Sequence, residues 1–282
     1  MIPSRKELQD QADFELIRQA YRFRNRKKGA RQIKMTLERK FEVIMNLKKI
    51  RRLMKKYGLF CPIRKANPYR RMMKALQTDS VFENRLDRNF YPEIPGKVFS
   101  TDITYLFYPG GKAYLSSIMD LATKEVISHK ISNTLEIPFV LNSVHILADK
   151  YTEESLKGSY IHSDQGCHYT SRQFQELVKE YQMGQSMSRR GNCWDNAPKE
   201  SFFGHMKDEL NLHLCKNFQD LENEIEDYMD YYNNDRYQWR LSKMTPSEYR
   251  AFLLYGVIPN NINHINTKDD RLYRRSSSLE KL

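Results

Sequence analysis

Apolar residues in the first quarter of the chain recur at the three- and four-residue spacing of a helix. This spacing predicts a helix over residues 14–26 and a second one near residues 30–39. A third helix begins after Asn46, whose side chain can cap it, and ends before Gly58. Three short basic helices in succession favour a helix-turn-helix-like unit over residues 1–60.

From residue 97 onwards, the pattern changes to the alternation of strands, interrupted by helical stretches. It predicts strands over 98–108, 113–119, 125–132, 159–163 and 184–188, with helices over 136–151 and 171–182. Short turns join the first three strands, which favours an antiparallel meander. If the helix before the fourth strand is a right-handed crossover, the fourth strand lies parallel to the first and beside it. The fold class is therefore α/β, with a mixed five-stranded sheet and flanking helices.

The composition divides the chain into successive regions. We expect the helix-turn-helix-like domain over 1–60, a charged, proline-containing linker over 61–95, an α/β domain over 96–210, a helical C-terminal extension over 211–255 and a flexible tail over 256–282. Thr245 and Glu248 form a predicted capping box around Pro246. Because no apolar run is long enough to cross a bilayer and no apolar secretory segment follows the first charges, we expect a cytoplasmic protein.

Charge is distributed unevenly along the chain. The net charge is +12, yet residues 1–75 contain 23 Lys or Arg against 6 Asp or Glu, so the remainder is slightly acidic. Such a block neutralises phosphates and releases counterions, which favours a nucleic-acid ligand over the alternative of a merely solvated basic face. The cations of the third predicted helix that lie off its apolar stripe are candidates for DNA contact: Lys48, Lys49, Arg51, Arg52, Lys55 and Lys56.

Two carboxylates are expected on neighbouring strands of the sheet. Alternation places Asp102 in the first strand on one face with Ser100 and Thr104, where an acid needs a cation, a metal or several donors. Asp164 ends the fourth strand, at the edge where ligand sites of α/β sheets gather. If the crossover is right-handed, the two carboxylates approach each other, and Mg²⁺ or Mn²⁺ would remove their repulsion.

A third carboxylate lies at the start of a later helix. Glu200 falls in the first turn of a helix that Asp195 or Asn196 caps. Glu200, Gly204 and Lys207 share one stripe of this helix, so a metal ligand, a gap for close backbone approach and a phosphate-binding cation can line up.

Each of these residues also fits a structural role when it is taken alone. Asp102 can be a salt-bridged or solvated strand acid, Asp164 a turn residue before glycine, and Lys207 a solvated helix lysine. His162 shares a sheet face with Asp164 and can support it, but a hydrogen-bonded structural histidine fits at least as well. Asp120, beside a turn, is expected to be structural.

The spacing of the three carboxylates is specific in combination with the residues around them. Asp102 and Asp164 are separated by 61 residues, and Asp164 and Glu200 by 35. The segments that matter most are Thr101-Asp102-Ile103-Thr104-Tyr105, His162-Ser163-Asp164-Gln165-Gly166, Asp195-Asn196-Ala197, Glu200-Ser201-Phe202-Phe203, Tyr232-Asn233-Asn234 and Thr245-Pro246-Ser247-Glu248-Tyr249-Arg250. Over residues 14–250 the chain resembles the second-frame (orfB) transposases of the insertion-sequence-three family, which share the DDE signature of retroviral integrases.

The resemblance implies a ribonuclease H-like catalytic domain in which Asp102, Asp164 and Glu200 bind two Mg²⁺ or Mn²⁺ ions. It implies a DNA transposase that hydrolyses a phosphodiester at the end of a mobile element and joins the freed 3′-hydroxyl to a target. By analogy with integrases, Lys207 would hold terminal DNA, with Asn196 and His162 beside the carboxylates. The implied partners are the element ends and target DNA, further copies of the chain and a first-frame (orfA) protein or fusion.

Two other functions stay open from the sequence. A ribonuclease H-like nuclease without strand transfer would use similar acids but would not need the basic helices or Lys207. A non-catalytic DNA-binding regulator would need only residues 1–75. No histidine precedes His129 and no leucine-zipper heptad is present, so we expect no counterpart of the integrase zinc domain and no zipper.

Two further residue types bear on ligand binding. The four cysteines, Cys61, Cys167, Cys193 and Cys215, are too far apart in the sequence to indicate a disulfide framework or a zinc site. Trp194 is a candidate to stack on an unpaired base, although core packing is the better interpretation of most aromatic residues.

Overall fold

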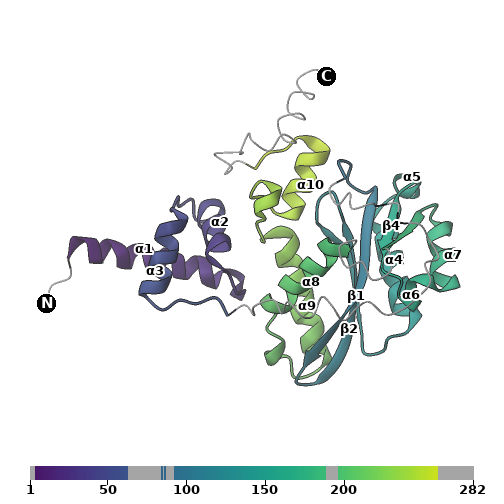
Figure 1. Cartoon of the computed structure of the whole chain (residues 1–282), viewed down its shortest axis with the longest axis horizontal. Coiled ribbons are helices and arrows are strands. Elements are labelled where there is room, and N and C mark those ends of the chain that lie inside the picture. The colour runs from purple at the N-terminus through teal and green to yellow at the C-terminus, as the bar shows by residue number, and fades with distance from the viewer. Residues whose placement is uncertain (1–3, 63–83, 85, 87–91, 189–195, 260–282) are drawn as a thin grey trace, which may run out of the picture. The chain divides into compact units, whose positions relative to one another are not determined.

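The computed structural model describes residues 4–62, 84, 86, 92–188 and 196–259 (Figure 1). The chain divides into two compact units, one made of residues 65–232 and the other of residues 1–64 together with 233–282. Most of the predicted linker and of the predicted tail lies outside the described residues, as do Trp194, Asp195 and Cys193.

The larger unit is built on one five-stranded sheet, as predicted. Its strands are β1 (Val98–Tyr108), β2 (Gly111–Asp120), β3 (Val126–Ser132), β4 (Tyr160–Ser163) and β5 (Gly184–Met187), in the order β3-β2-β1-β4-β5. β1 pairs antiparallel with β2, and β2 with β3, whereas β1 pairs parallel with β4, and β4 with β5. The mixed sheet and the placement of the fourth strand beside the first are thereby confirmed.

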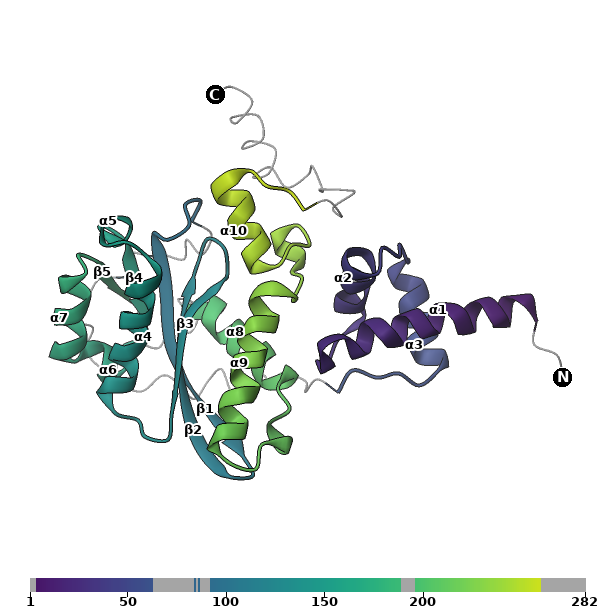
Figure 2. The same ribbon diagram turned by 180° about the vertical axis from the view of Figure 1, so that it is seen from behind.

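Helices cover both faces of this sheet (Figures 1 and 2). One face carries α4 (Ile137–Lys150), α5 (Glu153–Leu156), α6 (Cys167–Thr170) and α7 (Arg172–Glu180); the other carries α8 (Ala197–Glu209) and α9 (Phe218–Asn234), with a 3₁₀ turn at Leu212–Leu214 between them. The four-residue helices α5 and α6 were not predicted, because one turn is too short to show a period.

The alternation of β1 separates two apolar cores. Phe99 packs with Ile161 and the residues of α4 and α7 in one core. Leu106 points the other way and packs with Phe202 of α8 and Tyr228 of α9 in the second core. Burial of these large side chains holds α8 and α9 on the face to which Asp102 belongs, at about 1.5–3 kcal/mol for each fully buried side chain.

Three helices form the N-terminal part of the smaller unit: α1 (Arg5–Arg22), α2 (Ala30–Lys40) and α3 (Leu47–Lys56), with a 3₁₀ turn at Phe23–Asn25 after α1. Ile17, Leu37 and Leu53 lie in their shared core. The predicted cap is confirmed, because the Asn46 side chain accepts a 2.8 Å hydrogen bond from the Lys48 backbone N–H. Helix α1 begins nine residues earlier than predicted, where Ser4 caps it.

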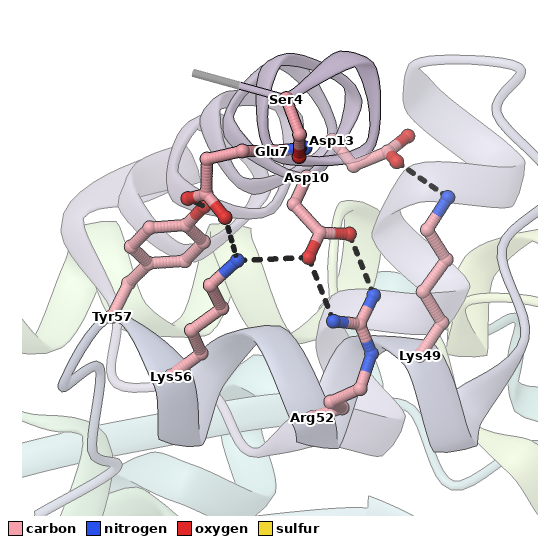
Figure 3. A network of polar contacts seen from close by, with 8 residues as sticks. All are labelled: Ser4, Glu7, Asp10, Asp13, Lys49, Arg52, Lys56 and Tyr57. Carbon is pink, nitrogen blue, oxygen red and sulfur yellow. Dashed lines mark hydrogen bonds and ion pairs between the residues drawn. The ribbon is translucent and has the colours of Figure 1, made fainter. Parts of the chain in front are cut away.

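The early turns of α1 are polar, and ion pairs rather than apolar contacts attach them to α3 (Figure 3). The Arg52 guanidinium donates two hydrogen bonds, of 2.7 and 2.6 Å, to the two oxygens of Asp10. Lys56 bridges Asp10 and Glu7, and Lys49 pairs with Asp13. We call these ion pairs the α1–α3 clamp. Because these first turns are polar, apolar periodicity predicts a start of α1 that is too late.

The hydrogen bonds of the α1–α3 clamp change the pKa values of its members. Those from Arg52 and Lys56 hold the pKa of Asp10 well below its ordinary value. Bonds from Lys56 and Tyr57 lower the pKa of Glu7 as well. Both acids therefore favour the folded state most when they are ionised.

The C-terminal part of the smaller unit consists of a 3₁₀ turn at Trp239–Leu241 and α10 (Pro246–Tyr255) around a small core that includes Met244 and Phe252. The predicted capping box is present: the Thr245 side chain accepts from the Glu248 N–H, and the Glu248 carboxylate accepts from the Thr245 N–H. Glu248 also pairs with Arg39 of α2.

Several smaller expectations can be compared with the structure. Asp120 is fully buried and accepts backbone hydrogen bonds of 2.7 Å from Gly96 and from Ala122, which fits its expected structural role. Cys61, Cys167 and Cys215 are free thiols. In the described part of the chain, none of the helices combines the length and apolar character needed to span a membrane.

The α1–α3 clamp generates a prediction about α1. Replacing Asp10→Asn removes the charge that Arg52 and Lys56 share, so backbone amides of α1 should exchange with deuterium about tenfold faster in the full chain at neutral pH. Because the pKa of Asp10 is lowered on folding, its stabilisation is complete above pH about 4 and is lost as the pH falls further. The difference between the two proteins should therefore shrink towards pH about 3.

The matched control is Glu15→Gln on the same helix, because Glu15 pairs only with the half-exposed Arg18 in the described contacts. This control should leave exchange of α1 nearly unchanged. Equal protection in Asp10→Asn and the unaltered chain, measured by mass spectrometry, would refute the role given to the clamp.

Candidate active site

Asp102 and Asp164 lie at equivalent positions of two neighbouring parallel strands. The register pairs Ser100 of β1 with His162 of β4, and each carboxylate follows two residues later. Asp164 comes directly after the end of β4, whereas Asp102 is still within β1 and faces Ser117 of β2. The parallel pairing therefore brings the first two predicted site residues together.

A buried tyrosine lies close to both carboxylates. Tyr169 of α6 is fully buried, and its hydroxyl is 3.4 Å from the Thr101 hydroxyl. Burial raises the pKa of Tyr169 well above its usual value, and the negative charges of Asp102 and Asp164 raise it further. Because both charges act on one hydroxyl, Tyr169 lies within electrostatic range of both carboxylates.

Asn196 connects the start of α8 to β1. Its amide nitrogen donates a 3.0 Å hydrogen bond to the Asp102 carboxylate, and its amide oxygen accepts a 3.1 Å bond from the Ser100 hydroxyl. Asn196 occupies the N-cap position, but its side chain makes no capping hydrogen bond. The predicted capping role is therefore wrong for this side chain, since Asp102 and Ser100 engage it instead.

Lys199, one turn further along α8, is also directed at the sheet. Its ammonium is fully buried, donates a 2.7 Å hydrogen bond to the Ser117 hydroxyl and lies 5.1 and 5.2 Å from the ring centres of Phe202 and Phe203. Burial lowers the pKa of Lys199 to about 7, while the charge of Asp102 acts in the opposite direction. Lys199 and Asn196 thus attach the first turn of α8 to adjacent strands.

Glu200 follows Lys199 in the chain but is exposed, in the first turn of α8. Within the described ranges, no three His, Cys, Asp or Glu side chains are close enough together to hold a metal ion. The structure thus brings Asp102 and Asp164 together and places Glu200 at the start of the helix attached beside them, without gathering all three into one cluster.

Gly204 and Lys207 continue along α8 from Glu200. Apart from its chain neighbours and the nearby backbone of α8 itself, no described heavy atom lies within 4 Å of the position that a Cβ at Gly204 would occupy, so the helix is open there. Lys207 is partly exposed. A helical glycine costs about 1 kcal/mol relative to alanine. Here packing within the described chain does not explain it.

His162 is fully buried between two serines. Its Nδ1 lies 2.9 Å from the Ser186 hydroxyl of β5, and its Nε2 lies 3.0 Å from the Ser188 hydroxyl. These contacts connect β4 to the chain at β5 and favour the structural interpretation of this histidine.

The cations of α3 fall into two groups. Lys49, Arg52 and Lys56 form the α1–α3 clamp (Figure 3). Lys48, Arg51 and Lys55 are exposed on another side of the helix at positions i, i+3 and i+7. We call these three residues the outer stripe. Three of the six predicted DNA-contact residues of this helix, Lys49, Arg52 and Lys56, therefore already have carboxylate partners.

Three residues of the site were missed in the sequence: Ser117, Tyr169 and Lys199. A signal existed for one of them, because Lys199, Phe202, Phe203 and Met206 recur at i, i+3, i+4 and i+7, the spacing of a buried stripe. Ser117 and Tyr169 had none, since only the strand register and the fold of α6 against β1 bring them near Asp102.

Models of known protein families match most of the chain. A helix-turn-helix-like (HTH-like) domain matches residues 8–67, and the integrase core domain matches residues 92–193, which include Asp102 and Asp164. A second integrase core domain model matches residues 200–254, beginning at Glu200.

Individual relatives agree with these families. InsK of Escherichia coli (strain K12), assigned as the transposase of insertion sequence element IS150, is 36% identical over 79% of this chain and 77% of its own. The transposase for IS904 of Lactococcus lactis is 27% identical over 89% and 98%. Among solved structures, the HTLV-2 integrase catalytic core with magnesium aligns with 56% of this chain and 97% of its own, at 22% identity and a TM-score of 0.44. The chain therefore belongs to the integrase-core transposases of bacterial insertion sequences, in agreement with its resemblance to the insertion-sequence-three family.

Proposed function

We propose that this transposase cuts and joins DNA at a site formed by Asp102, Asp164 and Glu200, which together hold two divalent cations, Mg²⁺ or Mn²⁺. Enzymes with an integrase core depend on divalent metal ions. The observation that carries the proposal is the equivalent placement of Asp102 within β1 and of Asp164 directly after the parallel strand β4.

The donor set fits such ions. Carboxylate oxygens are the ligands that Mg²⁺ and Mn²⁺ prefer, and two adjacent anions repel each other unless cations lie between them. Glu200 lies in the same helical turn as Lys199, whose side chain is attached to the strand next to Asp102. A small shift of this exposed turn would let Glu200 join the two aspartates when DNA and metal bind.

The residues of the site would have different roles in the reaction. When bound, the two cations would activate the attacking oxygen and stabilise the leaving 3′-oxygen of an in-line phosphoryl transfer. Asp102, kept in place by Asn196, and Asp164 would fix the positions of the ligand oxygens. Tyr169 is a neutral phenol whose raised pKa opposes ionisation even further, so it adds no negative charge to the site.

DNA would reach the site along α8 and be retained by the N-terminal helices. Glu200, Gly204 and Lys207 lie on one stripe, and the open surface at Gly204 allows a phosphodiester backbone to approach the helix. The outer stripe of α3 supplies exposed cations for phosphates. Further copies of the chain and a first-frame protein remain predicted partners on the element ends.

The carboxylates can be tested by conservative substitution. Asp164→Asn keeps size and hydrogen bonding but removes a charge, so Mg²⁺-dependent cleavage and strand transfer should fall by about a thousandfold or more. Binding of element-end DNA, measured by gel shift in Ca²⁺, should persist. Asp149→Asn, on the exposed side of α4, is the control. Strand transfer by Asp164→Asn at the normal rate would exclude this site.

Lys207 can be tested separately from the metal site. Lys207→Ala should weaken binding of labelled element ends by about tenfold, since one charge-assisted phosphate contact is lost, and should leave binding of Mn²⁺ intact. Lys179→Ala, an exposed lysine on α7, serves as the comparison. Unchanged affinity of Lys207→Ala for the ends would rule out the proposed contact.

The two sides of α3 can be distinguished with variants of equal charge. Replacing Lys48, Arg51 and Lys55 by Gln should reduce the slope of log affinity against log salt by about 3 and leave thermal unfolding unchanged. Replacing Lys49, Arg52 and Lys56 by Gln should instead destabilise α1 and leave the slope of the folded protein nearly unchanged. Equal slopes for the two triple variants would contradict the assignment of the outer stripe to DNA.

A further inference from the structure

Lys199 places an ammonium group in the interior of the fold, where burial of a charge costs free energy. Among the described residues, only Lys28 and Lys199 are lysines in the class of largest fully buried side chains. Burial of an ammonium disfavours its charge unless hydrogen bonds or an opposite charge compensate. Lys28 receives that compensation from backbone carbonyls, including the Arg26 oxygen at 3.1 Å.

Lys199 lacks such a set of carbonyls and has one hydroxyl partner among its described hydrogen bonds. Its ammonium donates 2.7 Å to the Ser117 hydroxyl, and the rings of Phe202 and Phe203 contribute cation–π contacts. A methionine would fill the same apolar space on α8 without the cost of a buried charge. Packing alone therefore does not explain why a lysine occupies this position.

The sheet places a carboxylate next to the hydroxyl that Lys199 binds. Ser117 is the direct partner of Asp102 in the β1–β2 register, and of His129 in the β2–β3 register. The charge of Asp102 favours the protonated form of Lys199, against the effect of burial. On the far side of Ser117, the Nε2 of His129 lies 2.9 Å from the Glu226 carboxylate of α9, so this carboxylate has a partner of its own.

We propose that Lys199 is a resident counter-charge of the catalytic site: its buried ammonium, bound to Ser117 beside Asp102, offsets the Asp102 carboxylate before divalent cations bind. This inference rests on the proposed metal-binding role of Asp102. Beside Asp102, the protonated Lys199 stabilises the metal-free carboxylate and weakens the binding of cations. Lys199 thus offsets the charge of Asp102 when metal is absent and lowers the affinity of the site for metal.

The direction in which the affinity for Mn²⁺ changes distinguishes this role from simple packing. In Lys199→Met, the Mn²⁺ concentration that half-saturates the protein should fall by about tenfold, because a cation that opposes metal binding is gone. Lys199→Arg, which keeps the charge, should bind Mn²⁺ as the unaltered chain does. Binding is read from the loss of the free-ion electron paramagnetic resonance signal at one pH for all variants, without DNA.

A merely structural lysine gives the opposite result. Its loss would disturb α8 and raise the Mn²⁺ concentration required, so weaker or unchanged binding by Lys199→Met overturns the inference. Lys28→Met, which removes the other fully buried lysine from the N-terminal helices, should leave Mn²⁺ binding unaffected. If Lys199→Met does not fold by circular dichroism, Lys199→Gln replaces it, because it is neutral and can still donate to Ser117.

A metal-free measurement tests the charge pairing independently of the proposed function. In the presence of chelator, the Asp102→Asn substitution is made in two proteins, the unaltered chain and the Lys199→Met variant. The melting temperature should fall by about 2–4 °C more in the unaltered chain, because only there does Asp102 have its counter-charge. Additive effects of the two substitutions would overturn the pairing. Failure of the unaltered chain to bind Mn²⁺ would instead contradict the proposed metal site. The melting comparison would then still test whether Lys199 and Asp102 interact.

Discussion

The parallel pairing of β1 with β4 is the constraint on which the site depends. Asp102 and Asp164 are far apart in the chain, and only this ladder, which aligns Ser100 with His162, brings their carboxylates to equivalent positions. A shift of one residue would turn one carboxylate to the opposite face of the sheet. The contacts of His162 with Ser186 and Ser188 join β4 to the chain at β5 and so help to hold this register from the other side.

Glu200 is positioned by a different kind of element from the two aspartates. It lies on a helix rather than a strand, and the start of that helix is attached to the sheet by polar side chains: Asn196 binds β1, and Lys199 binds β2. The apolar residues Phe202 and Phe203 secure the following turn. Because Glu200 itself is exposed, its position can adjust while the attached side of the helix stays in place.

Much of the fold could be predicted from the sequence, because β1, β2 and the crossover helix have clear periodicity. The capping residues Asn46 and Thr245 also mark the starts of their helices. The assignment of Asp102, Asp164 and Glu200 as metal ligands came from their spacing and from the family resemblance, and it stays a prediction. What remained hidden depends on tertiary contacts between polar groups. Asn196 binds Asp102 instead of capping α8, and the first turns of α1 are held by charge rather than by apolar burial, so neither follows a periodic pattern.

The division of α3 between the α1–α3 clamp and the outer stripe has a consequence for how such proteins diversify. Residues that secure the fold and residues that face outward occupy different sides of one short helix. Substitutions on the outward side can therefore accumulate without unfolding the protein. The strength of the proposed phosphate contacts can therefore change while the clamp keeps α1 attached to α3.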